Sequence, residues 1–196
     1  MLKVMERLDK RIIITSFASN VARMETAFYC AEKTGRQIAL VGRSMHRIYK
    51  AARQCRYLNN VIEPLDSRDV KNISREKIVY LCTGSQGEPM GAMTRIANYI
   101  HPDVFIERGD AVIFSSKIIP GNEKKLYKLH NQLVKEGIEV ISEDSEFIHV
   151  SGHPNREDLK DMYNWIKPKS VIPVHGEHRH MICLLYTSDA ADDRIC

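Results

Sequence analysis

Histidines are concentrated toward the end of this 196-residue chain, and this is its strongest chemical feature. Five of the eight histidines fall between residues 149 and 180. The first group reads His149-Val150-Ser151-Gly152-His153, and the second surrounds His175. A neutral imidazole is a common metal ligand, and a charged imidazolium can bind phosphate. These residues therefore point to a site for a metal ion, a phosphate group or both.

The first group suits phosphate. Its serine and two imidazoles offer several donors, and its glycine lets the backbone approach a ligand closely. Histidines that only satisfy loop carbonyls are the alternative. His175 follows an apolar run and fits a metal ligand and a structural histidine equally well. His178 and His180 lack ligand spacing, so we interpret them as surface residues.

The run Thr83–Glu88 is small, polar and glycine-rich, and it precedes a predicted helix. Backbone N–H groups at such a position can bind an anion. The run lacks both the Walker Gly-Lys-Ser/Thr and the G-x-G-x-x-G spacing. On these residues alone, a tight strand-to-helix turn is the favoured interpretation. Lys117, in a second polar loop, is likewise interpreted as a solvated lysine rather than a phosphate contact.

Strands and helices alternate along the chain. This order predicts an α/β fold with a mostly parallel, Rossmann-like sheet and helices on both faces. The region 59–76 is predicted to be irregular. Polar loops follow the strands, and ligands bind beyond the carboxyl ends of strands in such sheets. The predicted strands lie at 11–15, 37–41, 77–81, 104–106, 111–114, 138–141, 147–150 and 170–174.

Composition limits the class of protein. Hydrophobic residues make up 43% and charged residues 28%, which are globular values. Neither an apolar run long enough to span a membrane nor a signal peptide is present, so a cytoplasmic protein with no membrane partner is expected. The five cysteines are scattered without a C-x-x-C pair, which argues against a disulfide framework or a thiolate zinc site. The net charge of +4 allows an anionic partner, although a solvated surface is the favoured explanation.

Residues 183–196 break the pattern of everything before them. The sequence LLYTSDAADD within them resembles the translation of a sequencing-library adapter. We interpret the segment as a non-native read-through tail and exclude it from the fold prediction. The remainder is more basic than the whole, and it is expected to be a piece of a longer protein.

Six ordered motifs together resemble ribonuclease J, of the metallo-β-lactamase-fold β-CASP nucleases. They lie at 15–20, 41–45, 82–89, 119–123, 149–153 and 167–177. The resemblance implies a β-CASP domain over residues 11–152, after a leader at 1–10. A short strand–helix–strand return into a metallo-β-lactamase fold would follow at 153–182, before the tail at 183–196.

The activity implied by the resemblance is metal-dependent hydrolysis of RNA phosphodiester bonds. Members act as 5′-to-3′ exonucleases and as endonucleases in RNA processing and decay. The implied partner is single-stranded RNA, bound at its 5′ end. The implied cofactor is a pair of Zn²⁺ or Mn²⁺ ions, and the full-length parent is expected to form a homo-oligomer.

Site residues carry over from the family motifs by position. His153 matches a motif histidine and is the expected catalytic residue, while His175 matches a histidine that ligates one metal. The expected RNA-binding residues are Ser19, Asn20, His149, Val150, Ser151, Gly152 and His153.

The family's H-x-H-x-D-H ligand motif does not occur in this sequence. The isolated chain is therefore expected to bind the metal pair weakly and to lack nuclease activity. A non-catalytic RNA- or phosphate-binding α/β module is the first alternative. An unrelated nucleotide-binding α/β enzyme is the second.

Overall fold

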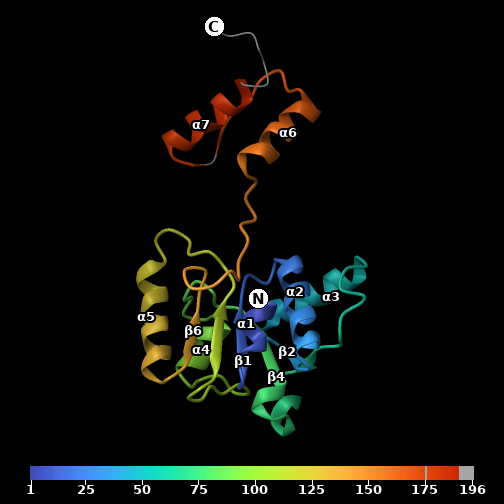
Figure 1. Cartoon of the computed structure of the whole chain (residues 1–196), viewed down its shortest axis with the longest axis vertical. Helices are drawn as coiled ribbons and strands as arrows, with labels where there is room; N and C mark the ends of the chain where they lie inside the picture. The colour runs from blue at the N-terminus through green and yellow to red at the C-terminus, as the bar shows by residue number, and fades with distance from the viewer. Residues whose placement is uncertain (175, 190–196) are drawn as a thin grey trace. The chain divides into compact units, whose positions relative to one another are not determined.

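The computed structural model describes residues 1–174 and 176–189. They fall into two compact units, residues 1–150 and the residues from Ser151 onward, which are described separately (Figure 1). The first unit is built on one six-stranded sheet. Its strands are β1 (Ile12–Thr15), β2 (Gln37–Val41), β3 (Leu65–Asp66), β4 (Ile78–Cys82), β5 (Ala111–Phe114) and β6 (Glu139–Ile141).

The strand order is β3-β2-β4-β1-β5-β6, and every neighbouring pair is parallel. β1 lies near the centre and is buried throughout, as the run of β-branched residues predicted. The predicted α/β fold with a parallel sheet is therefore confirmed.

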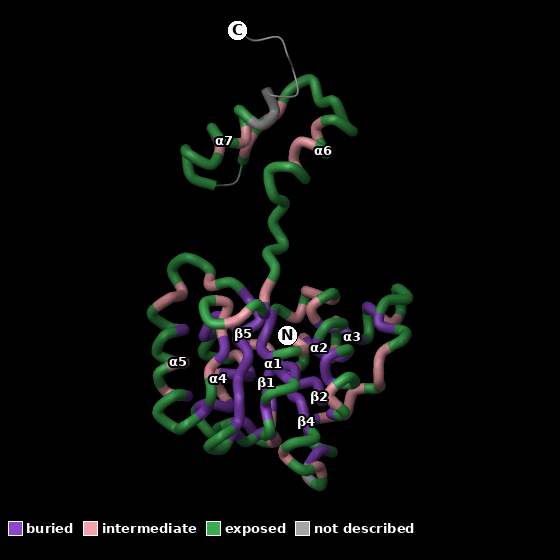
Figure 2. The backbone as a smooth tube through the Cα atoms, in the orientation of Figure 1, coloured by how far each residue is buried: buried purple, intermediate pink, exposed green. Residues whose placement is uncertain are grey.

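Helices cover both faces of this sheet. On one face, Ile12 and Ile14 of β1 pack against α1 (Leu2–Glu6), α2 (Val21–Lys33) and α3 (Arg43–Gln54). On the other face, Ile13 packs with α4 (Ala92–Ala97) and α5 (Glu123–Lys135). Two short 3₁₀ helices, η1 (Asp69–Asn72) and η2 (Arg75–Lys77), precede β4. The buried backbone in Figure 2 follows the strands, so the sheet is the core between the two helical layers.

Two strands predicted in the first unit are wrong, at residues 104–106 and 147–150. Side chains form hydrogen bonds with backbone groups that pairing with a neighbouring strand would require. The Val104 N–H donates to His101 Nδ1 at 3.2 Å. The carbonyls of Ile148 and Val150 accept from Arg23 at 2.7 and 3.2 Å. Neither segment therefore joins the sheet.

Other boundaries also differ from the prediction. The two-residue strand β3 lies in the region predicted to be irregular, and it is too short to show any periodicity. The helix expected to include Pro89 begins only at Ala92. Residues 1–10, expected as a leader, contain α1, which buries Val4 and Met5 in the core.

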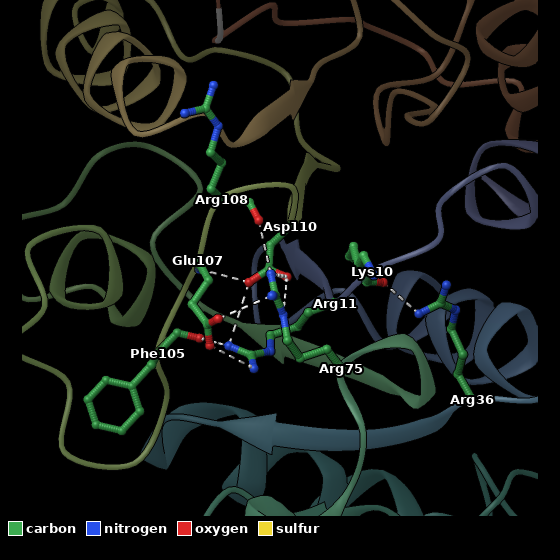
Figure 3. Close-up of polar contacts among 8 residues, drawn as sticks. All are labelled: Lys10, Arg11, Arg36, Arg75, Phe105, Glu107, Arg108 and Asp110. Carbon is green, nitrogen blue, oxygen red and sulfur yellow. Dashed lines mark hydrogen bonds and ion pairs between the residues drawn. The ribbon is translucent and has the colours of Figure 1, made fainter.

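The amino edge of the sheet carries a charge cluster around one buried carboxylate (Figure 3). Asp110, just before β5, is fully buried and accepts from Arg75 at 2.8 Å. It also accepts from the Glu107 N–H at 2.8 Å, and Arg11 lies 3.6 Å away. Glu107 pairs in turn with Arg75 at 3.1 Å. The carboxylate is thus compensated by two guanidiniums and one backbone donor.

The second unit contains α6 (Arg156–Ile166) and α7 (His178–Asp189). Asn155 and Asp158 form a capping box at the start of α6, which confirms the predicted helix. The strand predicted at 170–174 is wrong: Val174 is 89% exposed and the described residues of this unit offer no strand to pair with. α7 extends into the segment expected to be a tail. Throughout the described residues, no helix has the length and apolar character to cross a bilayer.

Candidate functional site

Three polar loops meet at the carboxyl edge of the sheet. They are residues 16–20 after β1, 83–88 after β4 and 115–117 after β5. The Ser16 N–H donates to the Cys82 carbonyl at 3.1 Å, and the Ser115 N–H donates to the Thr15 carbonyl at 3.0 Å. Because β1 lies between β4 and β5, these loops are direct neighbours. This is the edge at which the sequence predicted a ligand site.

Arg23, in the first turn of α2, ties the segment before Ser151 to this edge. Its Nη1 donates to Ser115 Oγ and to the Ile148 carbonyl, both at 2.7 Å. Its Nη2 donates to the Val150 carbonyl at 3.2 Å. Ser115 Oγ donates to the same Ile148 carbonyl at 2.6 Å. One guanidinium therefore fixes the backbone that leads into the expected phosphate-binding residues.

The loop before α2 explains why Arg23 is held in place. The Asn20 side chain is the N-cap of α2 and accepts from the Arg23 N–H at 2.9 Å. Asn20, expected to bind RNA, thus has a structural role in the helix. Ser19 is exposed and lines a cavity of about 380 Å³, together with Phe17, Gly84 and others. Of the two predicted residues, Ser19 is the one whose side chain borders open space.

His149 is half-buried beside Arg23. Its Nδ1 lies 3.3 Å from Arg23 Nη2. A guanidinium only donates, so this nitrogen accepts and the ring proton lies on Nε2. Burial lowers the pKa of His149 from its ordinary value, and the positive charge of Arg23 lowers it further. The negative charge of Glu143 acts in the opposite direction and offsets part of this shift. At neutral pH His149 can therefore offer a ligand a neutral N–H donor rather than an imidazolium.

The remaining expected RNA-binding residues lie mostly open to solvent. Val150 is 62% exposed, and its carbonyl is the group that Arg23 holds. Ser151 and Gly152 begin the second unit, and no heavy atom lies within 4 Å of the position that a Gly152 Cβ would take. The His153 N–H donates to Ser151 Oγ at 3.1 Å, and the residue is exposed. The predicted metal ligand His175 lies outside the described residues.

The loop 83–88 is organised by Gln86, which is buried. Its Nε2 donates to the Lys117 carbonyl at 2.9 Å, and its Oε1 accepts from the Ile119 N–H at 2.9 Å. The Gln86 N–H donates to Glu88 Oε2 at 2.9 Å. A carboxylate of the protein thus already occupies the anion-binding position at this N–H. The loop joins the β4 and β5 edges as a structural turn.

Two of these roles escaped the sequence prediction. Arg23 lies outside the apolar face that defined α2, and Gln86 was one polar residue within a glycine-rich run. A long cation three residues after a helix N-cap, beside a strand end, is the available signal for Arg23. The groups that hydrogen-bond to the Arg23 and Gln86 side chains lie about 30 to 127 positions away in sequence, and only the fold brings them close.

No three histidine, cysteine, aspartate or glutamate side chains gather to form a metal site in the part of the chain that the structure describes. The described donors therefore do not fit the metal pair that the resemblance implies.

Two family models match the chain in succession. Residues 9–133 match the β-CASP domain of ribonuclease J. The chain belongs to the ribonuclease J family. Residues 137–185 match a Zn-dependent metallo-hydrolase RNA specificity domain. The first match covers β1 to β5 and most of α5, and the second covers β6, the expected phosphate-binding segment, α6 and the first part of α7.

Individual ribonucleases J agree with this assignment. The chain is 40% identical over 179 residues to Ribonuclease J of Sinorhizobium meliloti, covering 91% of this chain and 32% of that protein. It is 43% identical over 182 residues to Ribonuclease J 1 of Streptococcus pyogenes, covering 91% of this chain and 32% of that protein. It is 40% identical over 172 residues to Ribonuclease J2 of Bacillus subtilis, covering 87% and 31%. The chain thus spans about a third of the length of these family members.

Proposed function

We propose that this chain is the β-CASP and RNA-specificity part of a metal-dependent ribonuclease that hydrolyses RNA phosphodiester bonds. The main support is the tandem family match, which covers both units. The contacts of Arg23 add to it, because they hold the expected phosphate-binding segment at the edge where α/β sheets bind ligands.

Within this proposal, individual residues of the chain bind RNA, stabilise charge during cleavage or ligate the metal. His149, Ser151 and the Gly152 backbone bind the RNA phosphate, and Ser19 contributes from the neighbouring loop. His153 stabilises the charge that develops on the phosphate or the leaving group. His175 supplies one ligand to a metal pair, of zinc or manganese, whose other ligands come from elsewhere in a longer protein. When bound, such ions would supply an activated water and positive charge next to the scissile phosphate.

The finer features of the proposal follow the family. The substrate is single-stranded RNA, which the enzyme degrades from the 5′ end as an exonuclease and also cuts internally as an endonuclease. The longer enzyme acts in the cytoplasm as a homo-oligomer. Of the expected tail at 183–196, we propose that the residues after 185, where the RNA-specificity match ends, are not part of that enzyme.

A chimaera tests the activity. Residues 11–182 replace the matching segment of the Streptococcus pyogenes Ribonuclease J 1, which is 43% identical. We expect Mn²⁺- or Zn²⁺-dependent cleavage of a 5′-labelled single-stranded RNA. His175→Ala and His153→Ala should each lower the rate by about 100-fold or more. His178→Ala, a neighbouring exposed histidine, is the matched control and should retain activity.

The outcomes separate the alternatives. A folded chimaera that binds RNA without cleaving it would favour the non-catalytic RNA-binding module. The chain by itself is expected to leave the same RNA intact at any metal concentration. Metal-dependent decay by the purified chain, lost in His175→Ala, would contradict the division of metal ligands proposed above.

A further inference from the structure

A second feature of the carboxyl edge is a basic pocket of about 670 Å³ at the ends of β2 and β4. Its walls come from the start of α3, the loop after β4, and α4 with the segment that follows it. Six of its residues carry polar or charged side chains: Arg43, Ser44, Arg47, Thr83, Arg95 and His101. None of its lining residues is acidic. Neither the histidine group nor Arg23 belongs to it.

The arginines of the basic pocket lack counter-charges. Arg43 and Arg47 are exposed and lie one turn apart on α3. Among the ion pairs of the described residues, none involves either of them or Arg95. Arg75 at the opposite edge, by contrast, is paired with Asp110 (Figure 3). Three uncompensated guanidiniums around one cavity create a positive potential that an anion would relieve.

The pocket also presents neutral donors. His101 is only 8% exposed, and its Nδ1 accepts from the N–H groups of Asp103 and Val104 at 3.3 and 3.2 Å. The ring proton therefore lies on Nε2, which is a donor. The 12-residue α3 begins at Gly42, which has no side-chain oxygen to cap the first turn. The positive end of the α3 dipole thus faces the same cavity as the arginines.

The shape of the edge favours a strand of RNA over a single small anion. The basic pocket shares Ser44, Arg47 and Thr83 with the 380 Å³ cavity that Ser19 lines. The two cavities are therefore adjacent along the ends of β1, β4 and β2, and Glu88 is the one acidic residue that lines the second of them. We propose that the basic pocket binds a backbone phosphate of single-stranded RNA, as a second phosphate subsite apart from residues 149–153. This inference rests on the proposed function, because it takes RNA as the ligand.

Salt-dependent RNA binding tests the inference. Purified full chain is titrated into a fluorescein-labelled oligouridylate of about 12 nucleotides, and anisotropy is read at several KCl concentrations. Arg43→Gln/Arg47→Gln should bind about tenfold more weakly than the parent. Its plot of log K against log salt should be shallower by about 1.4, since two phosphate contacts are lost. Both side chains are exposed, so the unfolding temperature should not change.

The matched control is Lys128→Gln/Lys135→Gln. It removes the same charge from exposed positions on α5, and it should leave the salt slope nearly unchanged. Equal losses in both double variants would overturn the subsite, because binding would then follow net charge alone. Absence of RNA binding by the parent chain at low salt would overturn it too.

Two further experiments identify which phosphate of the RNA binds and distinguish the second phosphate subsite from the proposed function. RNA with a 5′-hydroxyl and RNA with a 5′-phosphate should lose affinity equally in Arg43→Gln/Arg47→Gln. A loss confined to the 5′-phosphorylated RNA would overturn the backbone assignment. If Ser151→Ala weakens RNA binding while Arg43→Gln/Arg47→Gln does not, the second subsite fails and the proposed function stands.

Discussion

At the scale of single residues, Arg23 connects the sheet to the segment expected to bind phosphate. Its guanidinium hydrogen-bonds to groups from two chain segments far apart in sequence, at Ser115 and at residues 148–150. Asn20 fixes the start of the helix that carries it. Arg23 is therefore a positioning residue, since it acts on the ligand-binding backbone and not on the ligand.

Replacing Arg23 by glutamine should release this backbone. We expect the amides of residues 147–153 to exchange with solvent much faster, and the free energy of unfolding to fall by about 2 kcal/mol. Hydrogen exchange with mass spectrometry and urea unfolding measure the two effects. Arg43→Gln removes an exposed, unpaired arginine and should change neither. Unchanged exchange in the Arg23 variant would show that other contacts hold the segment.

His149 should make the stability of the chain sensitive to acid. Burial and Arg23 lower its pKa, so the unfolded chain binds the proton more tightly than the folded chain does. The free energy of unfolding should therefore be unaffected above the ordinary value of 6.5, and it should fall as the pH drops below it. Burial lowers the pKa of His101 and His130 as well, so they act in the same direction.

Urea unfolding at pH 7.5 and pH 5.0, about one unit above and one and a half units below the ordinary pKa of 6.5, measures this effect. His149→Gln should lose less stability on acidification than the parent chain. His178→Gln, at an exposed position, serves as the comparison and should behave like the parent. An identical pH dependence in His149→Gln and the parent would mean that the ring titrates in the same way in both states.

At the scale of elements, the two edges of the sheet differ in character: one carries cavities and unpaired charges, and the other carries ion pairs. The carboxyl edge gathers polar loops, two cavities and uncompensated arginines. The amino edge is fixed by Asp110, whose charge is compensated by Arg11 and Arg75. These ion pairs join the start of β5 to the residues before β1 and β4.

Asp110→Asn tests this role. The change leaves two guanidiniums near a buried neutral amide, so the free energy of unfolding should fall by about 3 kcal/mol. Asp66→Asn is the matched control, because the Asp66–Arg68 pair is open to solvent and should cost less than about 1 kcal/mol. Denaturant unfolding measures both. A loss at Asp110 no larger than at Asp66 would contradict the structural role.

At the scale of the whole molecule, the two units differ in how well they are packed. Residues 1–150 have a core on each face of the sheet, whereas none of residues 151–174 and 176–186 is buried (Figure 2). Trp165, Ile172 and Val174 are 76%, 79% and 89% exposed. Apolar surface of this kind favours association with another surface.

Purified chain should therefore self-associate as its concentration rises. Light scattering should report a growing mean mass, and Trp165→Ser/Ile172→Ser should reduce that growth. Tyr57→Ser/Phe105→Ser removes exposed aromatic side chains from the first unit and should have little effect. A parent chain that stays monomeric at high concentration would show that the second unit covers its apolar side chains by itself.

The sequence by itself determined the class of fold and the family. Alternating apolar strands and helices predict a parallel sheet because each strand of such a sheet must be apolar on both faces, as at Ile12–Ile14. The histidine group and the glycine-rich loop were visible because their residue types are unusual for a solvated surface. These signals are local in sequence, so they can be recognised without a three-dimensional structure.

Only the tertiary structure decided how the site is held and where its charge lies. Arg23, Gln86 and the unpaired Arg43 and Arg47 look like ordinary surface residues in the sequence. Their roles depend on hydrogen bonds, and on missing counter-charges, across segments that the sheet order brings together. The strands predicted at 104–106 and 147–150 failed for the same reason. Apolar pattern predicts burial, but only the folded chain determines which partner takes each backbone hydrogen bond.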